Sequence, residues 1–444
     1  MTGGDRHQGG GSARPPRALQ AAGRLVSTTI EVDAKLMPGA VRAAGYDGRR
    51  LWSRGNASLL ALGEALRLPL PASWAARERT SLVHDVLATV TVHDDLGLPG
   101  CGPVAIGALP YDPAAGGHLV VPRLLLGRHG ARSWATLIEP PGATTSEVRR
   151  AIEDELAELR HEPPLEALPD GFELTACIPH DEWKQLVAKA VGEMEGGSLA
   201  KVVLARQVEV LANRPFVLPE TLARLASLYP SCTVFHIEGF IGASPEVLVR
   251  RMGAEILSHP LAGTVARSGD PATDEALLAA LMGSRKDRHE HQLVVDAISA
   301  KLRPFCASLD VPKTPTVVPL RNVSHLGTEI RGSLSPANAL LPTSLELAAL
   351  LQPTPAVGGL PVDAALRWQR DNEGFDRGCY AGPVGWLDGR GDGEWALGLR
   401  SATVSGRRAV LYAGNGIVAG SDPDAELAET QLKLQALLAA LVRP

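Results

Sequence analysis

Apolar residues alternate with polar ones in some stretches of the chain and recur at helical spacing in others, which predicts a mixture of short strands and helices. Residues 201–210 are rich in β-branched side chains, which predicts a strand. Residues 28–32 alternate between polar and apolar side chains and also predict a strand. Further strands are expected within residues 118–126, 232–238, 240–249, 314–330, 383–387, 395–403 and 411–413. Helices are expected within residues 145–160, 181–195, 274–305, 345–351 and 422–441.

Segments rich in glycine and proline interrupt this pattern. Residues 1–23 combine glycine, arginine and proline without apolar periodicity and are expected to form a disordered tail. Residues 258–264 predict a tight turn, and residues 353–359 predict a longer irregular one. The segment Ala413-Gly-Asn-Gly-Ile-Val-Ala-Gly420 predicts a glycine-rich turn whose backbone N–H groups are open to an anion.

The helix that follows this glycine-rich turn has two different faces. Glu426, Glu429 and Lys433 share one side, while leucines form an apolar stripe on another. Glutamate and lysine at this spacing are also common on a solvated helix. A second carboxylate pair, Asp287 and Glu290, has the same spacing in another predicted helix. Together the two helices predict an oxygen-rich site for a hard cation such as Mg²⁺, with a substrate carboxylate bridging the cation and the glycine turn.

Three other ionisable residues invite a functional interpretation. Lys201 begins a predicted strand and shares a face with Val203 and Ala205; such a lysine is usually solvated, but one that points inward could act as a base. Glu246 follows Ser-Pro in an apolar neighbourhood, where it is either a buried general acid or an ordinary turn carboxylate. His325 either orients a ligand or serves as a hydrogen-bonded structural residue.

Composition narrows the class of protein. The 444 residues are 45% hydrophobic and 21% charged, which is typical of a globular protein with a sizeable core, and the net charge of −5 argues against a nucleic-acid partner. Five scattered cysteines outside any metal-binding spacing predict reduced, mostly buried thiols in a cytoplasmic protein. No segment resembles a membrane span or a signal peptide, and neither a GxGxxG nor a Walker-type loop is present.

Nine short motifs follow one another from residue 201 to the C-terminal stretch. They are Lys201-Val-Val-Leu-Ala-Arg206, Ser244-Pro-Glu246, Pro260-Leu-Ala-Gly-Thr264, Lys286-Asp-Arg-His-Glu-His291, His325-Leu326, Pro353-Thr-Pro-Ala-Val-Gly-Gly359, Asp376-Arg-Gly-Cys-Tyr-Ala-Gly382, Leu399-Arg-Ser-Ala402 and residues 413–433. In this order they resemble the motifs of the chorismate-utilising enzymes, most closely those of the isochorismate synthases. The first 150 residues contain no diagnostic motif.

This resemblance implies an α+β fold, in which two antiparallel β-sheets stack in a single large domain surrounded by helices, as in component I of anthranilate synthase. The domain is expected to span residues 24–444, with a poorly diagnostic half at 24–173 and a motif-bearing half at 174–444. Length alone would equally fit two domains. The substrate pocket is expected between the two sheets.

The resemblance also implies roles for the catalytic and substrate-binding residues. Lys201 would be the base that activates water for attack on ring carbon C2 of chorismate, and Glu246 the acid that protonates the hydroxyl leaving C4. Arg400 and Tyr380 would bind the enolpyruvyl carboxylate. The other substrate-binding positions are expected at Gly263, Thr264, His325, Ala356, Gly414, Gly416 and Lys433.

A magnesium ion is the cofactor that the resemblance implies. Glu290 and Glu429 would ligate it, directly or through water, and the ion would hold the ring carboxylate of the substrate. Asp287 and Glu426 would support these ligands from behind. Lys433 would balance the charge of the acidic cluster.

Single positions separate the relatives within this family. Aminodeoxychorismate synthase uses a nucleophilic lysine where this chain has Ala262, so the covalent route is closed. Ala356 stands where anthranilate and salicylate synthases usually carry threonine, which favours an enzyme that stops at isochorismate. Salicylate synthase is the alternative, and anthranilate synthase component I or a non-catalytic chorismate-binding protein is less favoured. Asn415 replaces the usual alanine of the glycine turn and could crowd the substrate carboxylate.

Chorismate is the one partner that the resemblance implies. No nucleic acid, membrane or amidotransferase subunit is expected, and analogy with the family favours a monomer. The product could feed menaquinone, a catecholate siderophore, or salicylate made by a separate lyase.

Overall fold

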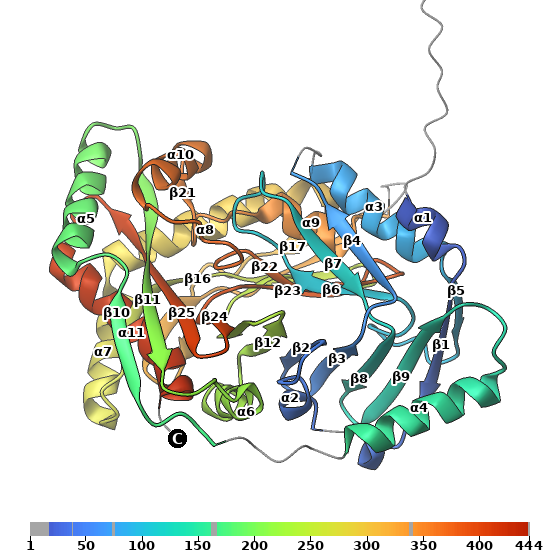
Figure 1. The fold of residues 1–444 in the computed structure, drawn as a ribbon. Coiled ribbons are helices and arrows are strands. Elements are labelled where there is room, and N and C mark those ends of the chain that lie inside the picture. Colours follow the sequence, from blue (N-terminus) through green and yellow to red (C-terminus); the bar gives the residue numbers. More distant parts are fainter. Residues whose placement is uncertain (1–16, 38, 73–75, 161–166, 337–340, 443–444) are drawn as a thin grey trace, which may run out of the picture.

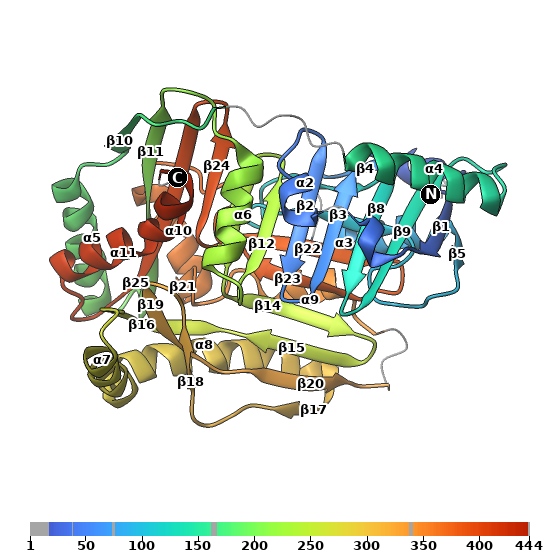
Figure 2. The ribbon, with the colours of Figure 1, turned by 90° about the horizontal axis from the view of Figure 1, so that it is seen from below.

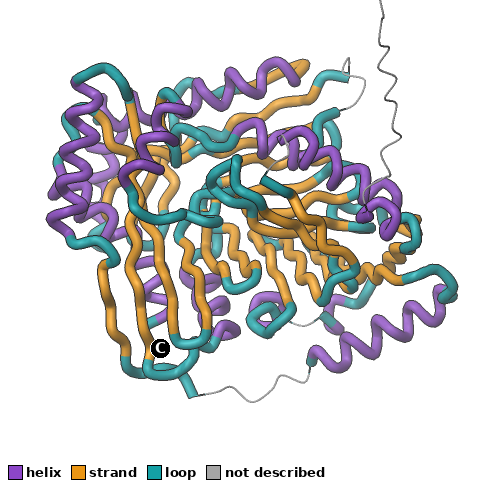
Figure 3. Tube along the Cα trace, turned by 45° about the horizontal axis from the view of Figure 1, so that its top comes forward, coloured by secondary structure: helices purple, strands orange, loops and turns teal. Residues whose placement is uncertain are grey.

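Three β-sheets form the frame of the molecule in the computed structural model, which describes residues 17–37, 39–72, 76–160, 167–336 and 341–442. Two of the sheets are large and stack on each other, and helices lie on their outer sides (Figures 1 and 2). Figure 3 shows the strands gathered in the middle of the molecule with helices around them. The predicted α+β fold of stacked sheets is confirmed.

Antiparallel pairing dominates the sheets, with β1 and β5 as a parallel pair at one edge. The thirteen-stranded sheet contains, in spatial order, β10 (Phe172–Ala176), β11 (Lys201–Ala212), β25 (Arg408–Val418), β24 (Ser401–Ser405), β13 (Phe240–Ser244), β12 (Thr233–Ile237), β2 (Arg49–Arg54), β3 (Ala57–Leu62), β8 (Leu124–His129), β9 (Arg132–Glu139), β1 (Val26–Glu31) and β5 (Thr91–Asp94), with β21 (Gly359–Leu360) beside β11. The nine-stranded sheet contains β17 (Cys306–Asp310), β20 (Ile330–Leu334), β15 (Glu255–His259), β14 (Val247–Met252), β23 (Gly393–Leu397), β22 (Pro383–Asp388), β6 (Val104–Ala108), β7 (Gly117–Val121) and β4 (Leu66–Leu70). The three-stranded sheet contains β16 (Leu261–Ala266), β19 (Val323–Gly327) and β18 (Thr316–Pro319).

Helices cover the outer faces of the two large sheets. The outer face of the thirteen-stranded sheet is covered by α2, α4 and α6, whereas α3, α8 and α9 lie on the side of the nine-stranded sheet (Figures 1 and 2). The helices of the described residues are α1 (Arg17–Ala22), α2 (Ala40–Ala43), α3 (Ala76–Thr89), α4 (Thr145–Leu159), α5 (His180–Glu195), α6 (Leu218–Leu228), α7 (Pro271–Gly283), α8 (Arg285–Leu302), α9 (Ser344–Leu351), α10 (Val362–Asn372) and α11 (Pro423–Leu441), with single 3₁₀ turns at Ala34–Leu36 and Arg303–Phe305.

A layer of large apolar side chains joins the two stacked sheets. Trp52 and Phe235 come from the thirteen-stranded sheet, and Ile106 and Trp386 come from the nine-stranded sheet. The Trp52 and Trp386 rings meet edge to face, with centroids 6.0 Å apart. Because all four side chains are buried, the sheets are fixed face to face by apolar packing.

The predicted helices lie where local signals placed them. Helix α4 begins after Thr144, which forms a capping box with Glu147, and α11 begins after Asp422, whose side chain accepts the N–H of Ala425. Within the described residues no helix combines the length and apolar character needed to cross a bilayer.

Four segments predicted as single elements prove to be pairs of strands in different sheets. Residues 118–126 form parts of β7 and β8, residues 240–249 form parts of β13 and β14, residues 258–264 form parts of β15 and β16 instead of a tight turn, and residues 395–403 form parts of β23 and β24. Pro122, Pro245, Pro260 and Gly398 mark these breaks, but both strands of each pair are buried, so the apolar residues on either side read as one continuous run.

Two of these sheet crossings place site residues. The chain leaves the thirteen-stranded sheet after β13 and enters the nine-stranded sheet at β14 through Pro245 and Glu246. It returns from β23 to β24 through Gly398–Arg400, where Arg400 has a φ of 48°. The Glu246 carbonyl accepts the Leu397 N–H over 3.1 Å, so the two crossings lie side by side at the seam between the sheets.

The glycine-rich turn predicted at residues 413–420 is also corrected. Residues 408–418 form the continuous strand β25, and Gly414 and Gly416 pair with Ala205 and Val203 of β11. The glycines suggested a turn, but they lie in a strand whose neighbours approach too closely for larger side chains.

Two smaller predictions also need correction. The disordered tail was expected to extend to residue 23, but α1 begins at Arg17, packs near α3 and buries Ala22; residues 1–16 lie outside the described residues. All five cysteines are free, but only Cys101 and Cys232 are buried, so the expectation of mostly buried thiols is wrong.

Candidate active site

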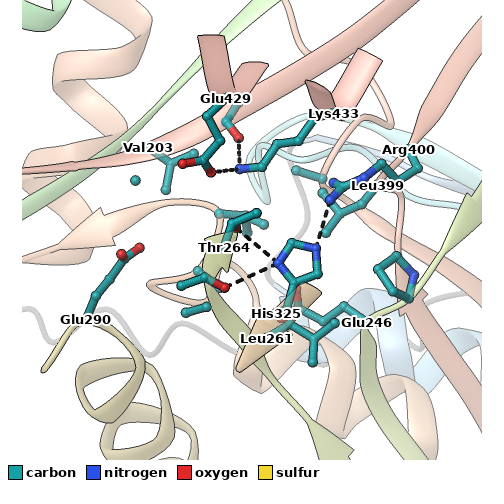
Figure 4. Close-up of a pocket in the computed structure, with 18 of the residues that line it drawn as sticks. Val203, Glu246, Leu261, Thr264, Glu290, His325, Leu399, Arg400, Glu429 and Lys433 are labelled. Carbon is teal, nitrogen blue, oxygen red and sulfur yellow. Dashed lines mark hydrogen bonds and ion pairs between the residues drawn. The ribbon is translucent and has the colours of Figure 1, made fainter. Parts of the chain in front are cut away.

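One cavity brings together nearly all of the predicted site residues (Figure 4). It lies where the thirteen-stranded and three-stranded sheets meet helices α8 and α11, and it encloses about 850 Å³ with its open mouth included. All predicted site residues except Lys201 line it: Glu246, Gly263, Thr264, Asp287, Glu290, His325, Ala356, Tyr380, Arg400, Gly414, Gly416, Glu426, Glu429 and Lys433.

Glu246 enters the cavity from the crossing between β13 and β14. Its side chain is wholly enclosed, with the residue 3% exposed, and this burial raises the pKa of the carboxyl to about 8. A hydrogen bond from the Leu261 backbone and the charges of Lys201 and Arg400 act in the opposite direction but do not outweigh burial. At neutral pH Glu246 is therefore a protonated acid that can donate a proton, as the interpretation of a buried general acid requires.

Lys201 lies at the start of β11 and is fully buried. Of the two interpretations left open for Lys201, the structure shows the inward-pointing one, on the face of Val203, and its Nζ lies 2.8 Å from Oε1 of Glu290. It is not itself among the lining residues, and it meets the cavity wall through Glu290. A Cβ on Gly416 would lie 2.5 Å from that Glu290 oxygen and 2.7 Å from Cε of Lys201, so only glycine permits this approach to β25.

Four carboxylates on one side of the cavity form what we call the acidic quartet: Asp287 and Glu290 from α8, with Glu426 and Glu429 from α11. Burial and the neighbouring charge of Glu429 raise the pKa of Glu426. Burial would also raise the pKa of Glu290, but the lysine charges around it, with that of Lys201 largest, hold the value below its ordinary range. The pairing of carboxylates from two helices, predicted from their matched spacing, is thus confirmed.

Lysines neutralise part of this acidic charge. Besides the pair of Lys201 with Glu290, Lys433 Nζ lies 2.7 Å from Oε1 of Glu429 (Figure 4). Lys286 Nζ lies 3.7 Å from Oε1 of Glu426, on the more exposed side of the cavity. The quartet therefore meets three lysines, and one carboxylate remains in excess.

The carboxylate oxygens of the quartet are the type of ligand that a magnesium ion prefers, although in this structure three of the four carboxylates are paired with lysines. Among the described residues no three His, Cys, Asp or Glu side chains are placed to hold a metal ion together. Carboxylate oxygens in one cavity, where burial and the neighbouring charge of Glu429 raise the pKa of Glu426, suit a hard divalent cation. Ligation by Glu290 and Glu429 would require them to exchange lysine for metal. Magnesium binding and the individual ligands stay predictions.

Arg400 is held in place by His325 on the other side of the cavity (Figure 4). The Arg400 Nη2 lies 2.9 Å from Nε2 of His325, and His325 Nδ1 lies 3.0 Å from the Thr264 hydroxyl and 3.3 Å from the Gly263 carbonyl. Guanidinium nitrogens can only donate, so Nε2 accepts and Nδ1 carries the ring proton. Burial and the charge of Arg400 lower the pKa of His325 well below its ordinary value, which keeps the ring neutral.

The Arg400 guanidinium is a buried cation without an ion-pair partner among the described residues. The residue is 8% exposed, its Nε has no hydrogen-bond partner there, and burial lowers its pKa. A buried charge of this kind is costly unless an anion meets it. The arrangement therefore suits a ligand that brings its own carboxylate.

The backbone of β25 offers further groups to such a ligand. Val203 and Ala205 donate their N–H groups away from β25, to the Gly358 carbonyl and to Glu373. In an antiparallel ladder, two residues that lie opposite each other point their backbone groups either both toward each other or both away. Gly416 and Gly414 lie opposite Val203 and Ala205, so their N–H groups point away from β11. The N–H groups of Gly414 and Gly416 are therefore not used in pairing with β11, and anion binding by them stays a prediction.

Tyr380 and two alanines complete the predicted lining. Tyr380 stacks on Tyr412 with centroids 5.1 Å apart, and burial raises its pKa to about 12, so the hydroxyl stays a hydrogen-bond donor. Ala262 and Ala356 both line the cavity. Neither offers a nucleophile or a hydroxyl to the ligand, in agreement with the reasoning from the sequence.

Two charged lining residues were missed. Lys286 adjoins Asp287 at the start of α8, and its place in the same motif was a usable signal. Arg377 donates to the Val203 carbonyl over 2.8 Å and to the Val357 carbonyl over 2.9 Å, and it forms a buried pair with Glu373. Arg377 stands in the motif Asp376–Gly382, so its place there was a usable signal, as was its spacing of four residues from Glu373. Arg377 ties β11 to the irregular segment that carries Ala356.

Asn415 does not crowd the cavity as expected. Its side chain is 1% exposed, is absent from the lining and points to α11, because neighbouring residues of a strand face opposite sides. There it donates from Nδ2 to the Glu426 carbonyl over 2.6 Å and accepts from Lys433 Nζ over 2.8 Å. The amide therefore contacts Glu426 and Lys433 on the side that faces away from the cavity.

Comparisons with known proteins identify the family of the chain. The family model described as "Chorismate binding enzyme" matches residues 17–442. The chain is 36% identical to isochorismate synthase DhbC of Bacillus subtilis over 350 residues, which cover 76% of this chain and 81% of that protein. It is 38% identical over 355 residues to a putative isochorismate synthase MenF of Mycobacterium tuberculosis, covering 77% of this chain and 87% of that one.

A solved structure gives the same answer at the level of the fold. The menaquinone-specific isochorismate synthase MenF of Escherichia coli superposes with a TM-score of 0.78 at 30% identity, covering 94% of this chain and 95% of that one. The match extends over both large sheets and the N-terminal half, which contains no diagnostic motif. The resemblance inferred from the nine motifs is confirmed, and the chain belongs to the family of chorismate-binding enzymes that includes the isochorismate synthases.

Proposed function

We propose that this protein is an Mg²⁺-dependent isomerase that converts chorismate to isochorismate. The observation that carries the proposal is the placement of Glu246, a buried acid with a pKa of about 8, in one cavity with the acidic quartet and with Arg400, which has no ion-pair partner among the described residues. Names of relatives such as isochorismate synthase DhbC support the reaction, and the residues of this chain support the mechanism.

Substrate binding follows from the charges of the cavity. Chorismate carries two carboxylates, and Arg400, steadied by His325, offers a preformed cation for the enolpyruvyl carboxylate. The Tyr380 hydroxyl and the N–H groups of Gly414 and Gly416 lie in the same cavity and would add neutral donors. Glu290 and Glu429 would hold Mg²⁺, which supplies the positive charge that binds the ring carboxylate.

The proton transfers would be divided between Lys201 and Glu246. Lys201 Nζ takes a proton from the water whose oxygen bonds to ring carbon C2, and the double bonds shift. Glu246 gives its proton to the hydroxyl on C4, which leaves as water, so one water is consumed and one is released. Lys201 is paired with Glu290 in the structure, and metal ligation by Glu290 would release Lys201 from this ion pair.

The test is product analysis with the full chain. Incubation with chorismate and Mg²⁺, followed by chromatography, should yield isochorismate and little pyruvate, and the Glu246→Gln variant should yield almost none. Stoichiometric pyruvate and salicylate would make the protein a salicylate synthase. Absence of any new product at every metal concentration would refute the proposed activity.

A further inference from the structure

Asn415 connects two site residues that lie two helical turns apart on α11. Its Nδ2 lies 2.6 Å from the Glu426 carbonyl and 3.1 Å from Oε2 of the same residue. Its Oδ1 lies 2.8 Å from Nζ of Lys433. The amide is 1% exposed, so no solvent competes for these contacts.

The chemistry of the contacts fixes the orientation of the amide. An ammonium can only donate, so the atom facing Lys433 must be the oxygen, and the two oxygens of Glu426 require the nitrogen opposite them. A flipped amide would set donor against donor and acceptor against acceptor. Asparagine fits because it offers one donor and one acceptor group at the ends of a short, rigid side chain.

Lys433 depends on this oxygen for its position. Its Nζ meets three acceptors: the Gly414 carbonyl at 2.9 Å, Asn415 Oδ1 at 2.8 Å and Glu429 Oε1 at 2.7 Å. Three acceptors saturate the three protons of an ammonium. Without the amide, Lys433 keeps two partners and gains freedom to swing within the cavity that it lines.

We propose that Asn415 is a positioning residue for the reaction: by holding Lys433 and Glu426 together from behind, it sets the charged wall that receives the metal and the substrate carboxylate. This inference rests on the proposed function, because it assigns Asn415 a part in forming that same site. Asn415 does not line the cavity, so its effect passes through the two side chains that it holds.

The matched control is Asn322, which also binds α11 but away from the cavity. Its Nδ2 donates to the Leu432 carbonyl over 2.6 Å, as Asn415 does to the Glu426 carbonyl, and it is not among the lining residues. Both asparagines anchor the helix, and only Asn415 also meets charged site groups. Loss of helix anchoring alone should therefore affect Asn322→Ala and Asn415→Ala alike.

The experiment compares Asn415→Ala, Asn415→Asp and Asn322→Ala in the full chain. Chorismate KM and kcat are measured at saturating Mg²⁺, and Mg²⁺ binding to the protein alone is measured by calorimetry. Asn415→Ala should raise KM and weaken Mg²⁺ binding by about 10-fold each, since bonds to charged groups are lost, with kcat changed less. Asn415→Asp keeps an oxygen for Lys433 but sets another against Glu426, so it should weaken Mg²⁺ binding more than it raises KM.

The outcomes separate this inference from the proposed function. If both Asn415 variants melt at lower temperature but retain wild-type KM and Mg²⁺ binding, as expected for Asn322→Ala, the positioning role is overturned. If the wild-type chain does not convert chorismate, the proposed function fails, and the calorimetric comparison still decides whether Asn415 shapes the metal site. Asn415→Asp is isosteric, so it carries the test should the alanine variant fail to fold.

Discussion

Replacing Glu246 with glutamine should make the protein more stable and nearly inactive at the same time. Glutamine keeps the shape of the side chain and an oxygen for the Leu261 N–H, but it cannot ionise or deliver a proton. The substitution therefore removes both the general acid and the buried ionisable group. We expect turnover to fall about 100-fold or more, as for loss of a general acid.

The gain in stability follows from the pKa shift. Burial raises the pKa of Glu246 from an ordinary 4.5 to about 8. Between these values the folded protein keeps a proton that the unfolded chain has lost, so the wild-type free energy of unfolding decreases as pH rises. At about 1.4 kcal/mol per pH unit, the decrease reaches about 5 kcal/mol above pH 8, and about 3 kcal/mol is already lost at pH 7.

The assay is denaturant unfolding of the wild-type and Glu246→Gln proteins at several pH values between 5 and 8.5, chosen to span that pKa window. The wild type and the variant should have similar free energies of unfolding near pH 5. Above pH 5 the free energy of unfolding of the variant should exceed that of the wild type by an amount that grows with pH. Glu173→Gln, which alters an exposed carboxylate on β10, controls for the loss of a charge and should follow the wild type. Parallel stability profiles for wild type and Glu246→Gln would refute the reasoning.

Three further substitutions test the remaining roles. Lys201→Ala should lower kcat about 100-fold or more, measured by isochorismate formation at saturating chorismate, and a near-normal kcat would exclude Lys201 as the base. Glu290→Ala should raise the half-saturating Mg²⁺ concentration about 10-fold or more, and an unchanged metal titration would contradict its role as a ligand. Arg400→Ala should raise the chorismate KM about 10-fold or more, because a charged hydrogen bond to the substrate is lost; an unchanged KM would contradict that contact.

Local signals in the sequence sufficed for the parts of the site that lie on helices. The spacing of Asp287 with Glu290, and of Glu426 with Glu429, fixes which side chains share a face whatever the rest of the fold does. Strand periodicity likewise placed Lys201 on one face with Val203 and Ala205, but it left open whether that face is buried or solvated. These predictions held because helix and strand periodicity are set over a few residues.

The misjudged parts depend on neighbours far away in the sequence. Gly414 and Gly416 suggested a turn because the sequence alone does not show Lys201, Glu290 or Tyr380 pressing on the strand from other elements. The direction of Asn415 could not be predicted for the same reason: once the segment is a strand and not a turn, its side chain must face α11.

The seam between the sheets explains how this fold places a neutral acid beside an unpaired cation. Both Glu246 and Arg400 lie where the chain passes from one sheet to the other, and there the backbone leaves the regular ladder and turns polar side chains inward. The strand positions that form the layer between the two large sheets bury apolar side chains such as Phe235 and Ile106, and an unpartnered charge placed among them would be costly. The Arg400 φ of 48°, unusual for a residue with a side chain, indicates that the crossing is held by its surroundings and not by local preference. A site built at the crossings can therefore shield charged groups from water without interrupting the apolar layer that holds the sheets together.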